Sequence, residues 1–393
     1  METLNLEKGN FRERLVRFIN SRRGHATLII SLFIIVFGAA GTAAYYRYFV
    51  PEGFNLQSAN NSILPNLSVK EVPKTEPSTL DGTEVDPSKA KIRPLAVMIE
   101  NHPDARPQAG LIDASVVFEV IVEGGITRFM AIFGPADAQK IGPVRSARPY
   151  FVHYAAGYKA LYTHAGGSQA ALALIPKTPA IVDLPHTAAY FEREPKPGIA
   201  VEHTLFTSSA KLYEFAKEKE VKLESEFTPL KFADDIASEQ RAATATLAID
   251  FSTPSYKAEW VYEREENIYK RSLAGAAHID RVTGDQITAK NIAVIEVERV
   301  YDAKTNQGKG EWFMTTEGEG KSTLIQNGTA TEGKWKKSST DEMLRLYDSN
   351  GNELTLIKGK TWFEVIPPGT SVTHTETPPL TATGDANLSG TIN

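Results

Sequence analysis

The chain has 393 residues, with 43 Lys and Arg, 48 Asp and Glu, and no cysteine. The lack of cysteine excludes a disulfide framework, a lipidated-cysteine anchor and thiolate metal ligands. Residues 1–50 hold seven of the basic and three of the acidic residues, which leaves 36 basic against 45 acidic in the remainder. This remainder is too acidic for general attraction to nucleic acid, so we expect no nucleic-acid partner and only a local anion site.

The first predicted element is a transmembrane helix at residues 26–46. This uncharged run of 21 residues is long enough, as a helix, to cross about 30 Å of hydrocarbon. Six basic side chains precede it, so the positive-inside rule keeps residues 1–25 in the cytoplasm and exports the rest. The sequence therefore predicts a single-pass protein of the bacterial cytoplasmic membrane with its folded part outside. A cleaved secretory signal is the alternative, although its apolar region is usually about 7 to 15 residues.

Two segments are expected to lack regular structure. Residues 47–91 are polar and contain five prolines, which predicts an extended extracytoplasmic linker. Residues 369–393 are Thr-rich with little apolar content, which predicts a disordered tail.

The region between them divides into two predicted domains, and the fold class is α+β. Residues 92–236 alternate apolar runs with helical patterns, which predicts a mixed sheet with helices. The strands are expected at 94–100, 115–122, 127–133 and 160–163, and the helices at 149–158, 168–175 and 208–221. Residues 237–368 consist of short alternating runs, which predicts a mostly β domain, and Asn327-Gly328 and Asn350-Gly351 are typical of tight turns between strands.

The strands at 115–122 and 127–133 carry the best candidates for catalytic carboxylates. If Gly124-Gly125 is a two-residue turn, Glu119 and Glu123 share one face of the hairpin, each diagonal to Arg128. One arginine between two carboxylates leaves either one unpaired negative charge or one carboxyl group with a raised pKa. A purely structural ion network explains the same pattern, and both interpretations stay open here.

Two further arginines precede the helix that begins at Pro149. Pro149 suits the first helical position, which places Arg145 and Arg148 at a helix N-terminus. The N-terminus already favours an anion, so two guanidinium groups there require a negative partner. Their partner is either Glu119 or Glu123, or a bound anionic ligand.

The segment from His164 to Ser168 joins a predicted strand to a helix. Gly166 and Gly167 allow close approach of the backbone to a ligand, and Ser168 suits a helix N-cap. A plain strand-to-helix turn explains the segment equally well. It matches neither a dinucleotide fingerprint nor a phosphate loop, so we expect no cofactor. The histidines are scattered without a His-x-x-x-His pair, so we expect no metal.

Residues 92–368 resemble the YerB-like family of bacterial surface proteins, a family with no established activity. The similarity in the first half lies in residues 94–101 (PLAVMIEN), 106–111 (RPQAGL), 118–129 (FEVIVEGGITRF), 142–150 (GPVRSARPY) and 164–168 (HAGGS). In the second half it lies in residues 269–271, 280, 283–284, 289–291, 327–328, 335–337 and 359–362. Family members often carry a lipobox cysteine, which this chain lacks. Where they tend to read HNLY, this chain has His203-Thr204-Leu205-Phe206, so the resemblance adds His203 to the candidate site.

We expect a membrane-anchored extracytoplasmic protein that binds an anionic cell-envelope ligand, either a glycopolymer or a peptidoglycan fragment. The expected binding residues are Arg128, Arg145, Arg148, His164, Gly166, Gly167, Ser168 and His203. One alternative is a cell-wall polymer phosphotransferase or hydrolase with Glu119 or Glu123 as base. Another is a protein-docking scaffold that uses Trp312, Trp335 and Trp362, with an unknown protein partner.

Overall fold

The computed structural model describes residues 74–224 and 227–379. Among these residues no helix is long and apolar enough to cross a membrane. The predicted span at residues 26–46 and the basic segment 1–25 lie outside the described residues.

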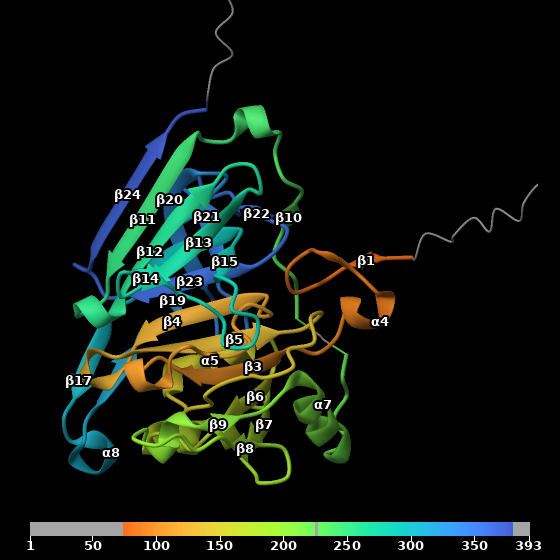
Figure 1. Ribbon diagram of the computed structural model, residues 1–393, viewed down its shortest axis with the longest axis vertical. Helices are drawn as coiled ribbons and strands as arrows, with labels where there is room; N and C mark the ends of the chain where they lie inside the picture. Colours follow the sequence, from red (N-terminus) through yellow and green to blue (C-terminus); the bar gives the residue numbers. More distant parts are fainter. Residues whose placement is uncertain (1–73, 225–226, 380–393) are drawn as a thin grey trace, which may run out of the picture. The chain divides into compact units, whose positions relative to one another are not determined.

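A ten-stranded mixed sheet combines strands from both halves of the chain (Figure 1). Two central pairs join β16 (Asn291–Glu296) to β23 (Thr361–Ile366) and β23 to β4 (Val116–Ile121) in parallel, so the chain's halves meet within one sheet. From one edge to the other, the remaining strands are β21 (Arg345–Asp348), β20 (Thr329–Lys337) and β19 (Gly318–Gln326) on the β16 side, then β5 (Thr127–Phe133), β3 (Leu95–Glu100), β6 (Leu161–His164) and β7 (Val182–Pro185) on the β4 side.

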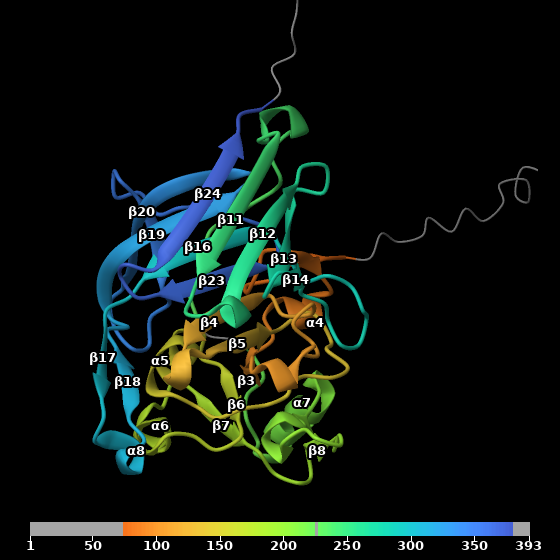
Figure 2. The ribbon, with the colours of Figure 1, turned by 60° about the vertical axis from the view of Figure 1, so that its left-hand side comes forward.

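A second, antiparallel sheet of six strands comes from the C-terminal half. It contains β11 (Thr244–Asp250), β12 (Lys257–Glu263), β13 (Ile268–Leu273), β14 (Ala276–Ala277), β15 (Thr288–Ala289) and β24 (Ser371–Thr377). Residues along β11 and β12 alternate between buried and exposed, which is the pattern of a sheet with one face on a core. That core joins Leu247 and Trp260 to Trp362 of the larger sheet, and Figure 2 shows β11, β12 and β24 in front of β16 and β23.

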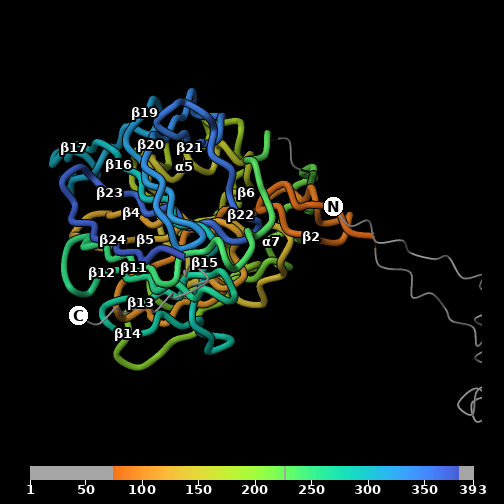
Figure 3. Tube along the Cα trace, turned by 90° about the horizontal axis from the view of Figure 1, so that it is seen from above, coloured from red at the N-terminus to blue at the C-terminus, as the bar shows by residue number. Residues whose placement is uncertain are grey.

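Helices cover the opposite face of the larger sheet beside β4 and β5. Helix α5 (Pro149–Gly157) packs Phe151 and Tyr154 in one core with Phe118, and Tyr154 stacks on Phe118 at 4.7 Å. Figure 3 shows α5 on one side of β23, β4 and β5, and β11 to β13 on the other. Because both faces of β4 are covered, every residue of this strand is buried.

The remaining elements are short. Helix α6 (Gln169–Leu174) follows β6. Helix α7 (Ser209–Glu218) lies within the predicted helix 208–221 and buries Leu212, Phe215 and Ala216 on one face. Four two-stranded ladders pair β1 (Glu76–Pro77) with β2 (Glu84–Val85), β8 (Glu192–Arg193) with β9 (Leu205–Phe206), β10 (Phe232–Ala233) with β22 (Leu356–Ile357), and β17 (Arg299–Asp302) with β18 (Glu311–Met314). Helices α4 (Pro87–Ala90) and α8 (Thr305–Gly308) have one turn each.

Two segments predicted to be unstructured are partly folded, which corrects the sequence analysis. Within 47–91, the β1–β2 hairpin and α4 form a small folded unit with Leu80 buried. Within 369–393, β24 pairs with β11 along seven residues. Threonine favours strands, and an exposed edge strand needs few apolar side chains. The low hydropathy of this segment therefore did not indicate disorder. Residues 380–393 lie outside the described residues.

The Asn327-Gly328 turn is confirmed as a two-residue hairpin between β19 and β20. Gln326 pairs with Thr329, and the two turn residues have φ of 56° and 80°. Positive φ at both positions is the signature of a type I′ turn. A Cβ added at Gly328 would lie 2.5 Å from Ala242 Cβ and 2.7 Å from Tyr262 Cε1.

The substitution Gly328→Ala is therefore expected to cost more stability than Gly351→Ala. Gly351 has a φ of 84° with nothing within 4 Å of an added Cβ, so its variant reports backbone strain alone, about 1 kcal/mol. Gly328→Ala adds crowding of about 1 to 3 kcal/mol to the same strain. Urea unfolding of both variants measures the difference. Equal losses would show that crowding at Gly328 is relieved at no cost.

Candidate functional site

The candidate binding residues gather at one edge of the ten-stranded sheet. Strands β3, β6 and β7 are parallel, so their carboxyl ends, at Glu100, His164 and Pro185, lie at the same edge. In open sheets of parallel strands, ligands bind outside these carboxyl ends. We call this region the carboxyl edge.

The segment that carries two of the arginines runs along the carboxyl edge. Glu100 N donates to Pro143 O at 2.9 Å, and Arg145 N donates to Met98 O at 2.9 Å. On its other side, Ala165 N donates to Arg145 O at 3.0 Å. These backbone bonds hold residues 143–148 between the ends of β3 and β6, beside the segment that begins at His164.

The predicted register of the β4–β5 hairpin is wrong by one residue. The structure pairs Ile121 with Thr127, so the connection is a short 3₁₀ turn, η2 (Glu123–Gly125), with flanking residues instead of a two-residue turn. A shift of one residue exchanges the faces of a strand. Glu119 consequently lies opposite Phe129, whereas Arg128 lies opposite Val120 and projects from the other face. Glu119 and Arg128 are not partners.

Arg128 is the most deeply buried of the three arginines, with 5% of its surface exposed. Its Nη1 donates to Ser146 O at 2.8 Å, and its Nε has no hydrogen-bond partner among the described residues. Burial, and next the charge of Arg148, lower its pKa to about 10. No carboxylate of the described region forms an ion pair with it.

Arg148 is held by Glu123, as the sequence analysis allowed. Its Nε lies 3.0 Å from both Glu123 carboxylate oxygens, and its Nη2 donates to Oε2 at 2.7 Å. Burial alone would raise the pKa of Glu123, but the bonds to Arg148 outweigh it and lower that pKa. The side chain of Arg148 is 11% exposed.

Arg145 pairs with Glu100, a carboxylate that sequence reasoning did not select. Glu100 is buried at the end of β3, and the Arg145 side chain is 27% exposed, the most accessible of the three arginines. His203 Nδ1 lies 3.7 Å from Glu100 Oε2. Glu100 lies directly opposite Arg128 in the β3–β5 pairing, so its charge acts on Arg128 as well as on Arg145.

The segment from His164 to Ser168 is held by its own contacts. His164 Nδ1 lies 2.7 Å from Gly166 O, and its Nε2 lies 3.0 Å from Asp183 Oδ1. Ser168 Oγ accepts from Ala171 N at 3.2 Å, which confirms it as the N-cap of α6, and donates to Glu311 of β18. Burial raises the pKa of Glu311, although its bond to Ser168 opposes the shift. The second half of the chain thus contributes a carboxylate that only the fold brings here.

Two buried tyrosine hydroxyls lie close to the arginines. Tyr150 and Tyr162 interact electrostatically with Arg128 and Arg148, and their hydroxyls have no hydrogen-bond partner among the described residues. Burial raises the pKa of both tyrosines, which keeps their hydroxyls protonated and able to donate. The interior beside Arg128 is therefore rich in donors.

Comparison with known proteins gives two matches to protein-family models. The model described as "Protein of unknown function (DUF3048) N-terminal domain" matches residues 80–222, and its C-terminal counterpart matches residues 247–363. The chain belongs to the DUF3048, or YerB-like, family. The resemblance seen in the sequence is thus confirmed.

The YerB-like assignment agrees with two comparisons to one Bacillus protein. The chain is 31% identical over 307 residues to the "Putative lipoprotein YerB" of Bacillus subtilis (strain 168), covering 76% of this chain and 89% of that protein. It also matches the crystal structure of YerB from Bacillus subtilis with a TM-score of 0.66 and 30% identity, covering 76% of this chain and 99% of that one. The α+β architecture with a mostly β C-terminal part is therefore shared within the YerB-like family.

Glu119 of this YerB-like chain belongs to a buried network between the two halves instead of the carboxyl edge. Its partner is Arg271 of β13, and neither side chain is exposed. The Arg271 guanidinium lies 4.9 Å from the ring centre of Trp362 and 5.5 Å from that of Trp260. Glu119 also accepts from Thr127 Oγ1 at 2.6 Å. No local pattern indicates this pairing, because 152 residues separate Glu119 and Arg271.

Two further titratable groups complete the buried network. His278 Nδ1 lies 2.7 Å from Arg271 Nη1, and Glu364 Oε1 accepts from Trp260 Nε1 at 2.9 Å. Burial, and next the charge of Arg271, lower the pKa of His278 well below its usual value. Burial, and next the charge of Glu119, raise the pKa of Glu364 well above its usual value. These shifts favour an uncharged His278 and a protonated Glu364 in the folded state.

The raised pKa of Glu364 predicts a pH dependence of stability. The folded state binds a proton at Glu364 that the unfolded state releases above about pH 4.5, so this residue lowers stability as pH rises, by up to about 1.4 kcal/mol per pH unit until the folded pKa is reached. Glu364→Gln keeps an acceptor for Trp260 and removes the titration. We expect its stability, measured by urea unfolding, to exceed that of the wild type by an amount that grows between pH 5 and pH 8. A constant difference across this range would contradict the assignment of a proton to Glu364.

Proposed function

We propose that this YerB-like chain is a membrane-anchored extracytoplasmic protein that binds an anionic cell-envelope ligand at the carboxyl edge. The uncharged run at residues 26–46 supports a single-pass anchor, and the name of the Bacillus relative supports a membrane-anchored surface protein. The two anchors differ in chemistry, because this chain has no cysteine.

The charge balance at the carboxyl edge is the observation that carries the binding proposal. Arg148 has Glu123 and Arg145 has Glu100. Arg128 is buried, has no ion pair of its own among the described residues and keeps a free Nε, and the Glu100 charge that acts on it is shared with Arg145. Burying a charge without a counter-charge is costly, so an anionic ligand would lower the energy of this site. Glu311, which acts on Arg148, is a poor counter-ion because burial raises its pKa.

Arg145 is the proposed point of entry for the ligand. It is the most exposed of the three guanidinium groups, and it can contact a ligand oxygen while keeping one bond to Glu100. Guanidinium groups bind phosphate and carboxylate through two parallel hydrogen bonds, and the N-terminus of the nine-residue helix α5 adds a favourable field. Phosphates of a glycopolymer and carboxylates of a peptidoglycan fragment both fit this chemistry.

The two alternative functions have less support. A phosphotransferase or hydrolase requires a carboxylate free to accept a proton, whereas Glu119 is buried with Arg271 and Glu123 is engaged by Arg148. A docking scaffold built on tryptophans is weakened because Trp335 and Trp362 are buried, which leaves Trp312 as the half-buried candidate.

Binding of poly(glycerol phosphate) to the full chain in detergent tests the proposal, with dextran as a neutral polymer. Arg145→Gln is expected to weaken binding about 10- to 100-fold, because it removes a charge-assisted bidentate contact. Arg145→Lys keeps the positive charge but loses the two parallel N–H donors of the guanidinium group. Its affinity should therefore fall between that of the wild type and that of Arg145→Gln. The measurement is a titration by calorimetry at fixed ionic strength.

Arg264→Gln is the matched control, since it removes one positive charge from an arginine that pairs with Glu265 away from the carboxyl edge. Thermal unfolding of each variant separates lost binding from lost folding. The proposal fails if Arg145→Gln binds like the wild type, or if Arg264→Gln weakens binding as much as Arg145→Gln.

A further inference from the structure

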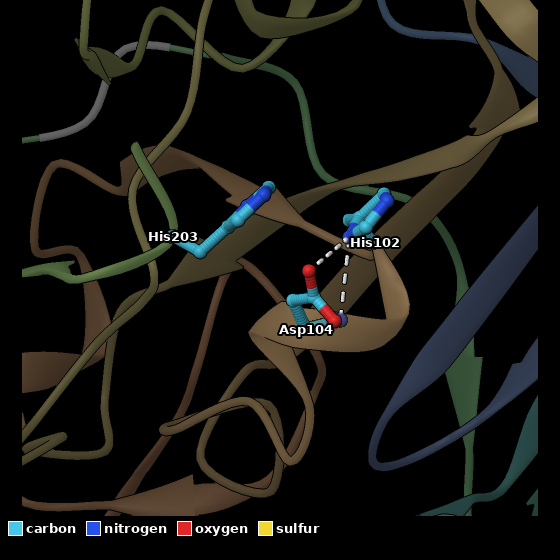
Figure 4. Close-up of side chains that lie close together, drawn as sticks. All are labelled: His102, Asp104 and His203. Atoms are coloured by element: carbon cyan, nitrogen blue, oxygen red, sulfur yellow. Dashed lines mark hydrogen bonds and ion pairs between the residues drawn. The ribbon is translucent and has the colours of Figure 1, made fainter. Parts of the chain in front are cut away.

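Two histidines and an aspartate from distant parts of the chain meet beside the carboxyl edge. His102 precedes a 3₁₀ turn, η1 (Pro103–Ala105), which contains Asp104, and His203 ends the 3₁₀ turn η4 (Val201–His203). The imidazole rings of the two histidines stack, with centroids 4.7 Å apart and planes 9° from parallel. Each residue offers one ligand atom, and these three atoms lie within 4.8 Å of one another (Figure 4).

The ring nitrogens of this cluster lie close to carboxylate oxygens. His102 Nδ1 accepts from Asp104 N at 3.2 Å, so it carries a lone pair, and it lies 3.7 Å from Asp104 Oδ2. His203 is nine-tenths buried, and its Nδ1 has no hydrogen-bond partner among the described residues. The same nitrogen lies 3.7 Å from Glu100 Oε2, so it faces a carboxylate and favours a bound cation, either a proton or a metal ion.

We infer that His102, Asp104 and His203 form a binding site for a divalent transition-metal ion of the Zn²⁺ class. Two imidazoles and one carboxylate are ligands that Zn²⁺ and related ions prefer, whereas Mg²⁺ and Ca²⁺ prefer oxygen ligands alone. Three protein ligands leave a fourth position open to water or to an incoming ligand. Glu100 is not counted as a ligand, because Arg145 already pairs with it.

The widest separation in the cluster must shorten by up to about 1.2 to 1.5 Å to hold the ion. Metal bonds of about 2.0 to 2.2 Å place tetrahedral ligand atoms about 3.3 to 3.6 Å apart, compared with 4.8 Å for the widest separation here. The side chains of His102 and Asp104 are 35% and 50% exposed, so both have room to turn. His203 is held in place by burial and by its stack with His102.

The expectation of no metal, drawn from the sequence, rested on the spacing of the histidines. His102 and His203 are far apart in sequence, and only the approach of η4 to the end of β3 brings them together. A search for His-x-x-x-His pairs cannot find such a site.

Equilibrium dialysis of the full chain against Zn²⁺, with the bound metal quantified, tests the inference. The wild type is expected to bind one Zn²⁺ in a manner that excess Mg²⁺ does not displace. His102→Ala, at a half-buried position, and Asp104→Asn, at an exposed one, should each weaken that binding at least about tenfold. Replacement by Co²⁺ should give visible absorption bands that are lost in both variants.

His374→Ala is the matched control, because His374 also lies near a carboxylate, with Nδ1 3.8 Å from Glu376 Oε2, but on β24. This variant should keep the wild-type affinity for Zn²⁺. Three results would overturn the inference: no Zn²⁺ bound by the wild type, wild-type affinity in His102→Ala and Asp104→Asn, or an equal loss in His374→Ala. Because no anionic polymer is present, the outcome is independent of the proposed function.

Discussion

The buried ion pair between Glu119 and Arg271 is the constraint on which the rest of the structure depends. It joins β4 of the first half to β13 of the second, with neither side chain exposed to water. Removing two charges from water costs several kcal/mol per ion unless their hydrogen bonds are satisfied. Thr127, His278 and two tryptophan rings supply those contacts, so the two halves can pack only in the one arrangement that completes them.

The same network reaches the carboxyl edge. His278 Nε2 lies 2.9 Å from Gln108 Oε1, and Gln108 Nε2 donates to Glu100 O at 3.0 Å. Because neutral His278 accepts from Arg271 at Nδ1, its Nε2 carries the proton that Gln108 accepts. Glu100 in turn holds Arg145 and lies beside His203. The core pair and the proposed binding residues are therefore linked by a continuous chain of polar contacts, and the second half of the molecule helps to position a site in the first.

Local sequence patterns predicted most of the elements but few of the partners. The strand at 127–133 and the start of α5 at Pro149 follow from an apolar run and from proline, which act locally. The predicted register of the β4–β5 hairpin was wrong because Glu123 joins the turn and Val122 N donates to Ile126 O, which residue type alone does not reveal. The pairing of Arg145 with Glu100, and of Glu119 with Arg271, depends on strand order across the sheet. No periodicity in the sequence encodes that order.

The central claim is that the carboxyl edge binds an anion through arginines, and a crystal of the full chain soaked in inorganic phosphate tests it most directly. The account predicts density at this edge with phosphate oxygens about 2.7 to 2.9 Å from Arg145 nitrogens. A phosphate-soaked crystal without density there, and with Arg145 still paired only to Glu100, would contradict it.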